Sequence, residues 1–526
     1  MSHRIFLYLL TAVLLISAVR GQPEISGRPV VIALPERFSV LDTLSNTITD
    51  AAADRLRTLI YNSLVKRNEK FEYVGELGDY KIGDDNLTVT YTLRDNIKFH
   101  NGKVMMSADV KYTFDALFQA NGAKAGSLYD SVPDETDPEK KKTKRVAHLS
   151  SIETPDPKTV VFKVTRPELV NQLLSNLVTI PIIPEGTIDR QKTAPVGSGP
   201  FKFGSFDQVK SIVRLEVFND YWEGAPKIAK LDVRTVADPE ALQNELLSGG
   251  VDLVLNPTIL SPEQLKELER SSKLSVRYFP GSNIQYIGFN TKAAPFNKVK
   301  VRQAVGYAID REKIIGELLN DQTRPAASIL PENSWAFAAG TKYVYDPAKA
   351  RRLLKAAGYR GGIVRFKYPS GNRAVSQIAQ LVQEMLKEVG FRVELETLEP
   401  LTLIEALKMG QFQMNIGIWI GGNQDPVFLR DLFASSDSPE KKLNGRNRAR
   451  FSNPQFDRII DEAVKTTDRA KAARLYAGAQ EIVSRELPLL PLWYPANVVV
   501  AGKRIKNPEA VSGGDWSLVK RLEIAE

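Results

Sequence analysis

Few side chains in this sequence are suited to catalysis. The chain has three histidines and no cysteine, so a thiolate nucleophile, a disulfide framework and a cysteine metal site are excluded. The HExxH, GxSxG, GxGxxG and phosphate-loop patterns do not occur. His100, in the turn KFHNGK, suits a hydrogen-bonded structural role. We predict that the protein is not an enzyme and holds no cofactor. The alternative, a secreted hydrolase, needs a nucleophile or an acid–base pair that the sequence does not locate.

The stretch MNIGIWIGGNQDP, Met414–Pro426, is better suited to gripping a ligand. An apolar run ends at Trp419-Ile420 and breaks into Gly421 and Gly422, and a single acid, Asp425, follows. Aspartate before proline is also a common helix start, so the simplest role of Asp425 is to cap a helix over DPVFLRDLF. The local sequence leaves open whether the acid serves a ligand or a turn.

Composition indicates a soluble globular protein of two or three domains. The 526 residues are too many for one ordinary core, and 43% are hydrophobic and 25% charged. The formal charge of +9 is modest for this length. The densest basic run, Glu139–Arg145, follows directly after the acidic DETDPE, which is typical of a solvated surface loop. We expect no nucleic-acid partner.

The N-terminus has the pattern of a secretory signal. MSHR supplies positive charge, Ile5–Ala18 is an uninterrupted apolar run, and small residues lead to Gly21. We predict residues 1–21 to be a signal peptide cleaved near Gly21. The apolar run is short for a membrane span, which takes about 20 residues. Because no cysteine can carry a lipid anchor, we predict a free protein in the periplasm.

Residue periodicity places helices and strands that belong to the α/β class. Leu87–Leu93 alternates apolar and polar residues, as a half-buried strand does. Asp238-Pro239 begins a helix that Gly249-Gly250 ends. The segment from Ile363 to Leu398 reads as a strand, a helix and a second strand, which is the length of a right-handed βαβ crossover. We therefore predict mixed sheets and more than one lobe.

Five ordered stretches resemble a known family, the extracellular solute-binding proteins of family 5, which serve ABC importers of oligopeptides and dipeptides. The resemblance runs from about residue 30 to the C-terminus, where ELPLLPLWYP also fits. The stretches are YTLRDNIKFHNGKVMMSADVKYTFDAL, VGSGPFKF, NDYWEGAPKIAKLDVR, GFNTKAAPFNKVKVRQAVGYAID and YDPAKARRLLKAAGY.

The resemblance implies a two-lobed periplasmic-binding-protein fold, of the class II or cluster C type, with an extra inserted small domain. The ligand lies between the lobes, and closure about a hinge traps it. The implied boundaries give a discontinuous lobe I at 22–53, 185–280 and 486–526, an inserted domain at 54–184 and lobe II at 281–485.

The resemblance also implies roles for residues around Asp425. Peptide-binding relatives have an acid that holds the free α-ammonium of the peptide, and Gly422 stands at its place here. Three interpretations remain open. Asp425 caps a helix, or it takes over the ammonium contact with a shifted ligand, or the ligand has no ammonium there.

Other ligand-binding candidates rest on matching position in the family. Trp419 is expected to line the ligand cleft, and the alternative is that its side chain belongs to the hydrophobic core. Arg373, at a predicted helix start, is placed to meet a ligand carboxylate, or is simply a solvated arginine. The remaining candidates are Gly421, Gly422 and Asn423 in the loop, Asn283 and Tyr286 where the chain reaches lobe II, and Arg37, Phe38 and Ser39 after the first strand.

The expected function is capture of peptides and delivery to the permease of an ABC importer with its ATPase. Peptide ligands in the family pair their backbone with strands of the protein. The runner-up is the same module for an oligosaccharide, an opine or a blocked peptide, and a sensor role is a third possibility. His3 belongs to the expected signal peptide, so two histidines remain in the mature chain and nickel binding through histidine is disfavoured. We expect a monomer.

Overall fold

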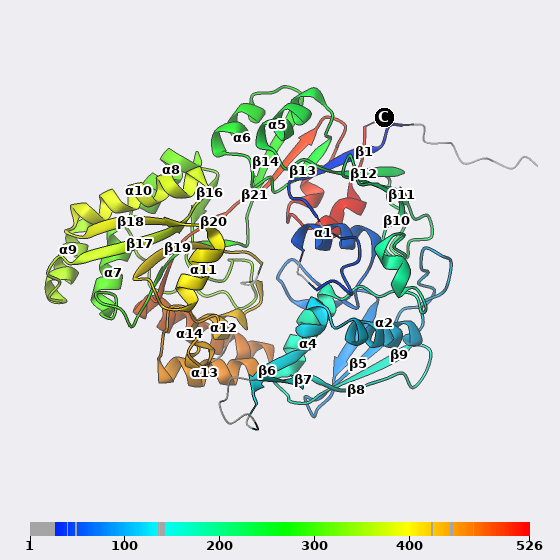
Figure 1. Cartoon of the computed structure of the whole chain (residues 1–526), viewed down its shortest axis with the longest axis horizontal. Coiled ribbons are helices and arrows are strands. Elements are labelled where there is room, and N and C mark those ends of the chain that lie inside the picture. The colour runs from blue at the N-terminus through cyan, green and yellow to red at the C-terminus, as the bar shows by residue number, and fades with distance from the viewer. Residues whose placement is uncertain are drawn as a thin grey trace, which may run out of the picture.

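The computed structural model has two mixed β-sheets, one in each of two lobes (Figure 1). The expected signal peptide lies outside the described residues, as do Ser39, Gly422 and Asn423. The described residues are 27–38, 40–47, 50–134, 136, 143–421, 424–441, 445–466 and 468–525.

Lobe I, which we define as the described parts of 27–60, 185–279 and 497–525, is built on a seven-stranded sheet. The strand order is β10-β11-β12-β1-β13-β21-β14. Helices α5 and α6 cover one face, and α1 with the short helix η5 covers the other. The elements are β1 (Val30–Leu34), α1 (Ala51–Ile60), η1 (Ile188–Lys192), β10 (Phe201–Asp207), β11 (Ile212–Val217), β12 (Lys230–Thr235), α5 (Pro239–Ser248), β13 (Leu253–Leu255), α6 (Pro262–Glu269), β14 (Leu274–Phe279), β21 (Asn497–Gly502), η4 (Pro508–Val511) and η5 (Trp516–Arg521).

Lobe II, residues 284–495, is built on a six-stranded sheet with the order β16-β20-β15-β19-β17-β18. Helices α7 to α10 pack on one face, and α12, α13 and α14 pack on the other. The elements are β15 (Ile284–Phe289), α7 (Val299–Ala308), α8 (Arg311–Leu319), β16 (Thr323–Pro325), α9 (Pro347–Ala356), β17 (Ile363–Pro369), α10 (Arg373–Glu388), β18 (Arg392–Leu398), α11 (Pro400–Lys408), β19 (Met414–Trp419), α12 (Phe428–Phe433), η3 (Ser435–Asp437), α13 (Pro454–Lys465), α14 (Arg469–Glu486) and β20 (Leu489–Pro495).

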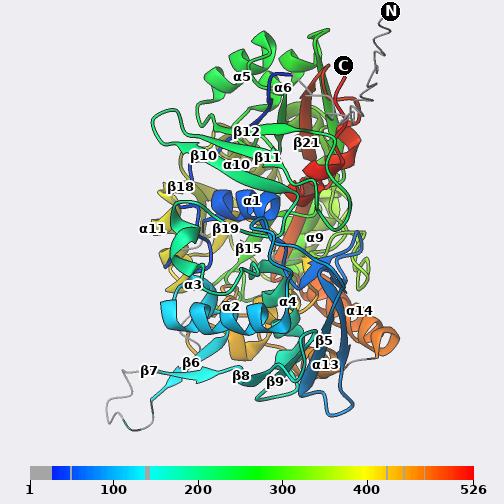
Figure 2. The ribbon, with the colours of Figure 1, turned by 90° about the vertical axis from the view of Figure 1, so that its right-hand side faces the viewer.

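The inserted unit, residues 61–184, shares its hydrophobic core with lobe I. Phe114 and Phe162 of the unit belong to the same buried cluster as Leu34 and Phe201 of lobe I. The β6–β7 hairpin projects away from the rest of the fold (Figure 2). The elements of the inserted unit are β2 (Val65–Arg67), β3 (Tyr73–Gly75), β4 (Gly78–Ile82), β5 (Thr88–Leu93), α2 (Ser107–Ala120), α3 (Ala123–Gly126), β6 (Tyr129–Pro133), β7 (Thr143–Ala147), β8 (Leu149–Glu153), β9 (Thr159–Val164) and α4 (Leu169–Thr179).

Local sequence signals account for the ends of several elements. The Asp238 carboxylate accepts a hydrogen bond from the Ala241 N–H at 2.8 Å, and Gly249 ends α5 in the left-handed conformation. The predicted βαβ unit is present: β17 and β18 pair in parallel over their full length, with α10 between them in the chain. These elements form where the sequence predicts them because caps and periodicity agree.

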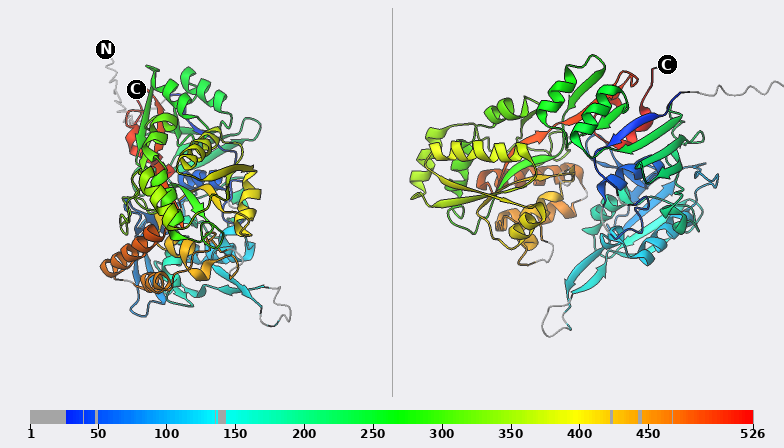
Figure 3. Two further views of the ribbon diagram at one scale, coloured as in Figure 1. Left: turned by 90° about the vertical axis from the view of Figure 1, so that its left-hand side faces the viewer. Right: turned by 45° about the horizontal axis from the view of Figure 1, so that its top comes forward.

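Two short segments connect the lobes, and they lie against each other. Residues 280–283 lead from β14 to β15, and Ala496 leads from β20 back to β21. The two lobes form separate bodies on either side of these crossings (Figure 3). None of the hydrophobic clusters formed by described residues combines lobe I with lobe II. The crossings can therefore act as a hinge.

The position of β20 differs from the expected boundary. The family resemblance implies that residues from 486 onward belong to lobe I, whereas β20 pairs with β15 and β16 in the sheet of lobe II. The chain returns to lobe I only at Ala496. The apolar run LPLLPLWYP carries no information on which sheet its strand joins.

His100 connects the inserted unit to a loop of lobe I. The Gly197 N–H donates to Nδ1 of His100 at 3.3 Å, and Nε2 lies 3.0 Å from the Gly199 carbonyl oxygen. Since a carbonyl can only accept, Nε2 carries the proton and the ring is neutral. These contacts agree with the structural role expected for His100.

Acid should weaken the fold through His100. Burial lowers the pKa of His100 from 6.5 to about 4, so the folded protein keeps the ring neutral while the unfolded chain takes up a proton. The resulting stability is complete above pH 6.5 and is lost as the pH falls toward 4. We expect the native protein to lose about 3 kcal/mol more than a His100→Gln variant between pH 7 and pH 4. Urea unfolding measures both, and equal losses would contradict the prediction.

Candidate ligand site

The ends of several strands meet at one edge of the lobe II sheet. β17 is parallel to β18 and to β19, so the carboxyl ends of all three lie at the same edge. β15 is antiparallel to β19, and its first residue, Ile284, pairs with Trp419. This edge therefore carries the chain crossing from lobe I together with the loops that follow β17, β18 and β19. In α/β sheets this is the usual place for a ligand.

The lobe I sheet presents a matching edge. β1 is parallel to β12 and β13, so their carboxyl ends lie together. Leu255, at the end of β13, pairs with Val499 near the start of β21, and Phe279, at the end of β14, pairs with Asn497. The crossings thus connect this edge to the edge of lobe II. Arg37 and Phe38 follow β1 at this edge, and Phe38 packs on Phe206 with ring centroids 5.1 Å apart.

Trp419 lies at the end of β19 within a group of aromatic rings. Its ring stacks on Tyr286, with centroids 6.1 Å apart and an interplanar angle of 13°, and meets Phe428 edge-on at 5.2 Å. Tyr286 is buried, and burial raises the pKa of its hydroxyl to about 12. Trp419 is only half-buried, while Ile418 and Ile420 on either side are 45% and 71% exposed. Trp419 therefore serves partly as core, and its partial exposure suits a cleft wall.

One edge of β19 is open beyond its first two residues. β15 pairs with the whole of β19, whereas β17 pairs with it only at Met414 and Asn415. Among the described strands, none pairs with the second edge of β19 from Ile416 to Trp419. Unpaired backbone donors and acceptors at a strand edge are a template for a further strand.

The loop after β19 is hydrogen-bonded to the crossing segment 280–283. Asn283 Oδ1 accepts a hydrogen bond from the Gly421 N–H at 3.1 Å, and Gln424 Nε2 donates to Ser282 Oγ at 2.9 Å. Gly421 has φ of +72°, a conformation that favours glycine. Two of the residues predicted from the family, Asn283 and Gly421, are thus in direct contact.

Asp425 has both carboxylate oxygens engaged. Oδ1 accepts a hydrogen bond from the Val427 N–H at 2.9 Å, which shapes the turn before α12 begins at Phe428. Tyr73, on β3 of the inserted unit, donates its hydroxyl hydrogen to Oδ2. The helix-start interpretation of Asp425 thus accounts for one oxygen only. The other oxygen joins lobe II to the inserted unit.

Further hydrogen bonds join the β2–β3 hairpin to lobe II. Arg67 donates to Gln424 Oε1 at 2.9 Å, and Arg469 lies 3.2 Å from Glu72 Oε1. Asn333 Nδ2 donates to the carbonyl oxygen of Glu69, at the tip of the hairpin, at 2.8 Å. Sequence reasoning missed Tyr73, Arg67 and Glu72, because no local pattern marks a hairpin that docks on residues more than 250 positions away.

Similarity to known proteins agrees with this architecture. The family model for bacterial extracellular solute-binding proteins, family 5 Middle, matches residues 72–440. The chain belongs to this family. Heme-binding protein A of Haemophilus influenzae is 28% identical over 501 residues, covering 90% of this chain and 88% of the relative. The glutathione-binding protein GsiB of Escherichia coli K12 is 29% identical over 501 residues, with 92% of each covered.

A solved structure confirms the two-lobed fold expected for this family 5 protein. The ABC transporter substrate-binding protein CtaP of Listeria monocytogenes gives a TM-score of 0.78 at 24% identity, covering 95% of this chain and 100% of that one. Family 5 proteins bind small ligands and work with ABC importer permeases. They are binding components and not enzymes, which confirms the prediction that the protein lacks catalytic activity.

Neither a metal-binding cluster nor a membrane-spanning helix is found among the described residues. They contain no group of three or more histidine, cysteine or acidic side chains placed to hold a metal ion. No helix within the described ranges is both long and apolar enough to cross a membrane.

Two predicted residues lie apart from the aromatic group. Arg373 is exposed at the first position of α10, after the end of β17, and Arg37 is exposed on lobe I. Each lies beyond the end of a strand at one of the facing edges. Their side chains face solvent, which is compatible both with a ligand contact and with the simpler solvated role.

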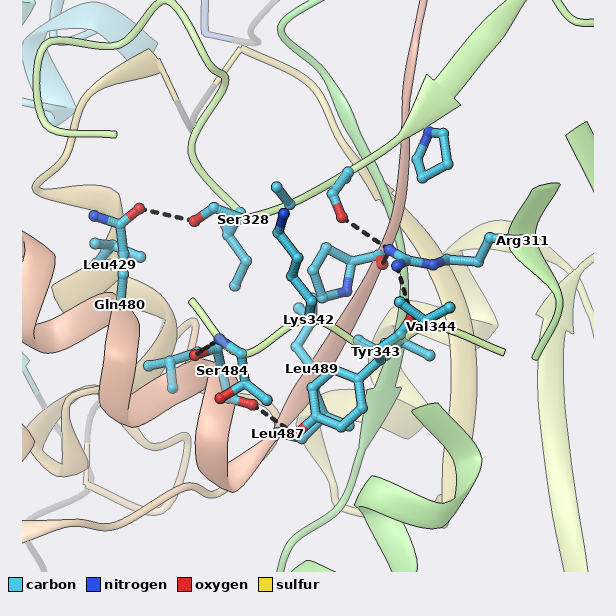
Figure 4. A pocket seen from close by; sticks show the side chains of 18 of the residues that line it. Arg311, Ser328, Lys342, Tyr343, Val344, Leu429, Gln480, Ser484, Leu487 and Leu489 are labelled. Carbon is cyan, nitrogen blue, oxygen red and sulfur yellow. Dashed lines mark hydrogen bonds between the residues drawn. The ribbon is translucent and has the colours of Figure 1, made fainter. Parts of the chain in front are cut away.

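A cavity of about 290 Å³ in lobe II lies away from these edges (Figure 4). It adjoins the first residues of β20, at the end of that strand remote from the crossing. Arg311 donates to the carbonyl oxygens of Ala326, Pro491 and Tyr343, and Gln480 Oε1 accepts from Ser328 Oγ at 2.7 Å. These polar groups find their partners within the protein, so the cavity is a feature of packing.

Proposed function

We propose that this family 5 protein captures peptides between its lobes and delivers them to an ABC-type import permease. The observation that carries the proposal is the open edge of β19 beside Trp419. An extended peptide presents the same backbone donors and acceptors whatever its side chains, so a strand edge suits ligands of varied sequence. Closure of the lobes over the added strand shifts the population toward the state that the permease binds.

A ligand without a free ammonium group at Asp425 is the second candidate. The carboxylate of Asp425 is held by Tyr73 and by the Val427 N–H, so an ammonium group would have to displace the tyrosine. A blocked peptide, an opine or an oligosaccharide does not need this contact. The printed names of two relatives, a heme-binding and a glutathione-binding protein, support a range of ligand classes within the family.

The proposal also covers the export of the protein and its division into two bodies. We propose a monomer that is released near Gly21 and works in the periplasm without a lipid anchor. We also propose that lobe I with the inserted unit and lobe II are the two bodies that close on the solute, hinged at residues 280–283 and at Ala496. The separate hydrophobic clusters of the lobes support this division.

Loss of one backbone donor from β19 should weaken peptide binding. Native mass spectrometry of the purified protein first identifies the co-purified solute, and short peptides are expected. An Ile418→Pro variant removes the N–H at the open edge, and we expect about a tenfold rise in Kd, the effect of one hydrogen bond. Calorimetric titration with the identified peptide measures this change.

The matched control is Ile418→Ala, which removes the side chain and keeps the N–H group. We expect this variant to bind within about threefold of the native protein, since Ile418 is largely exposed. Equal affinities of the proline and alanine variants would show that the peptide backbone does not pair at this edge. A sugar or an opine in the mass spectrum would replace the peptide proposal by the second candidate.

A further inference from the structure

A small pocket lies behind Trp419, on the face of the lobe II sheet that α12 covers. Its volume is about 30 Å³, and it is lined by residues of β15, β19, α11, α12 and the loop 446–449, among others. No acidic side chain lines it, whereas Arg446 and Arg448 both do. The surroundings are otherwise mainly apolar, with Leu432 and Phe433 among them. The pocket is therefore mainly apolar and bears two arginines, of which Arg446 is exposed and Arg448 is half-buried.

Three nitrogen donors of the pocket are buried and have no hydrogen-bond partner. They are Nδ2 of Asn415, Nε1 of Trp419 and Nε of Arg448. Asn415 is 3% exposed, so its amide cannot turn to bulk water. A buried donor without a partner costs about 1–3 kcal/mol, and such groups are rare in native proteins. Three of them around one small pocket indicate an acceptor that completes the site.

The charge of Arg448 is also unbalanced. Arg446 lies 3.1 Å from Asp431, but Arg448 forms no ion pair with any described residue. Arg448 is half-buried, and its guanidinium lies over the Trp419 ring, 5.4 Å from the ring centroid. A water molecule accepts at most two hydrogen bonds and brings no charge. A small anion is an acceptor for such donors and also balances the guanidinium.

We propose that this pocket binds a small monovalent anion through Arg448, Asn415 and Trp419. The chemistry required is a compact acceptor that bears one negative charge. A free halide ion and a carboxylate group both meet this requirement, and a carboxylate can be free or part of the transported solute. The site is formed by lobe II residues alone, so it does not depend on peptides being the solute.

The test uses the full-length mature protein without added solute. Sodium chloride, bromide, formate and acetate each replace sodium sulfate, whose ion is divalent, at constant ionic strength, so that screening stays the same. We expect the melting temperature to rise on the order of 1–2 °C and to saturate with anion concentration, as binding to the folded state requires.

Two variants and one control decide the assignment. Arg448→Gln should abolish the anion-dependent rise, and Trp419→Phe, which keeps a ring but removes one donor, should weaken the apparent affinity about threefold to tenfold. Arg458→Gln, which removes an exposed arginine of α13, should leave the rise unchanged.

The set of anions that raise the melting temperature identifies the kind of group that binds in the pocket. A response to halides points to a free inorganic ion, and a response to formate and acetate alone points to a carboxylate group; either supports the site. A melting temperature that does not change with any anion, or that changes equally in Arg448→Gln, overturns the proposal and leaves water in the pocket. Peptide titration of the same proteins is independent of this result, so failure here does not decide the transported solute.

Discussion

Gly281→Ala is expected to destabilise the protein by about 3 kcal/mol or more. A Cβ atom at Gly281 would lie 1.7 Å from the carbonyl oxygen of Pro495, the last residue of β20 before the other crossing. The obstacle is backbone, so no side-chain rotation can relieve the overlap. The two crossing segments must separate, which disturbs the last pair of β14 and β21, Phe279 with Asn497. Urea unfolding measures the loss in stability, and small-angle scattering measures the change in lobe separation.

Gly362→Ala is the matched control for the hinge variant. A Cβ atom at Gly362 would meet no heavy atom within 4 Å, and the residue lies before β17, away from both crossings. We expect this change to be neutral or slightly stabilising, because alanine restricts the unfolded chain. Equal stability of the two variants would mean that the crossing segments separate at no cost, and the hinge would then be looser than their contact indicates.

Tyr73→Phe is expected to shift the unliganded protein toward open lobes. The hydroxyl of Tyr73 donates to the Asp425 carboxylate across the interface between the inserted unit and lobe II. A hydrogen bond to a charged group contributes about 1.5–3 kcal/mol, so its loss should reduce the ratio of closed to open molecules about tenfold to a hundredfold. In the proposed mechanism the solute contacts both lobes only when they are closed, so its Kd should rise by a similar factor.

Distances between fluorophores on the two lobes measure this shift in single molecules. Tyr359→Phe serves as the control, because the Tyr359 hydroxyl donates to the Gly362 carbonyl oxygen within lobe II at 2.8 Å. We expect the control to keep the native distribution of distances. An unchanged distribution in Tyr73→Phe would show that the contacts of Arg67, Glu72 and Glu69 hold the lobes without the tyrosine.

The local sequence predicts much of the fold where one segment carries all the information. The βαβ unit of β17, α10 and β18 has its periodicity and its boundary residues within one continuous stretch. The Asp238 cap and the Gly249 end of α5 are likewise local. The sheet that β20 joins is not local, since its partner β15 lies two hundred residues earlier in the chain.

The candidate site shows the same limit. Aspartate before proline predicts a turn into a helix, and Oδ1 of Asp425 fulfils that role. The partner of Oδ2 is Tyr73, 352 residues away, and nothing in either segment marks the other. The unpartnered donors behind Trp419 also come from separate segments, with Asn415 on β19 and Arg448 in a later loop. Contacts of this kind depend on tertiary packing and become visible only in the structure.

The pairing of β14 with β21 has a consequence for how the chain is divided. These two strands are antiparallel neighbours, and their last pair, Phe279 with Asn497, lies where a hairpin would have its turn. Two residues such as Asn-Gly suffice to close a hairpin, yet here the whole of lobe II stands in that place. Apart from the inserted unit at 61–184, lobe I therefore has the connectivity of a single sheet with one very long turn. Lobe II occupies the position of a hairpin turn, and none of the strand pairs of the described lobe I sheet involves a lobe II strand.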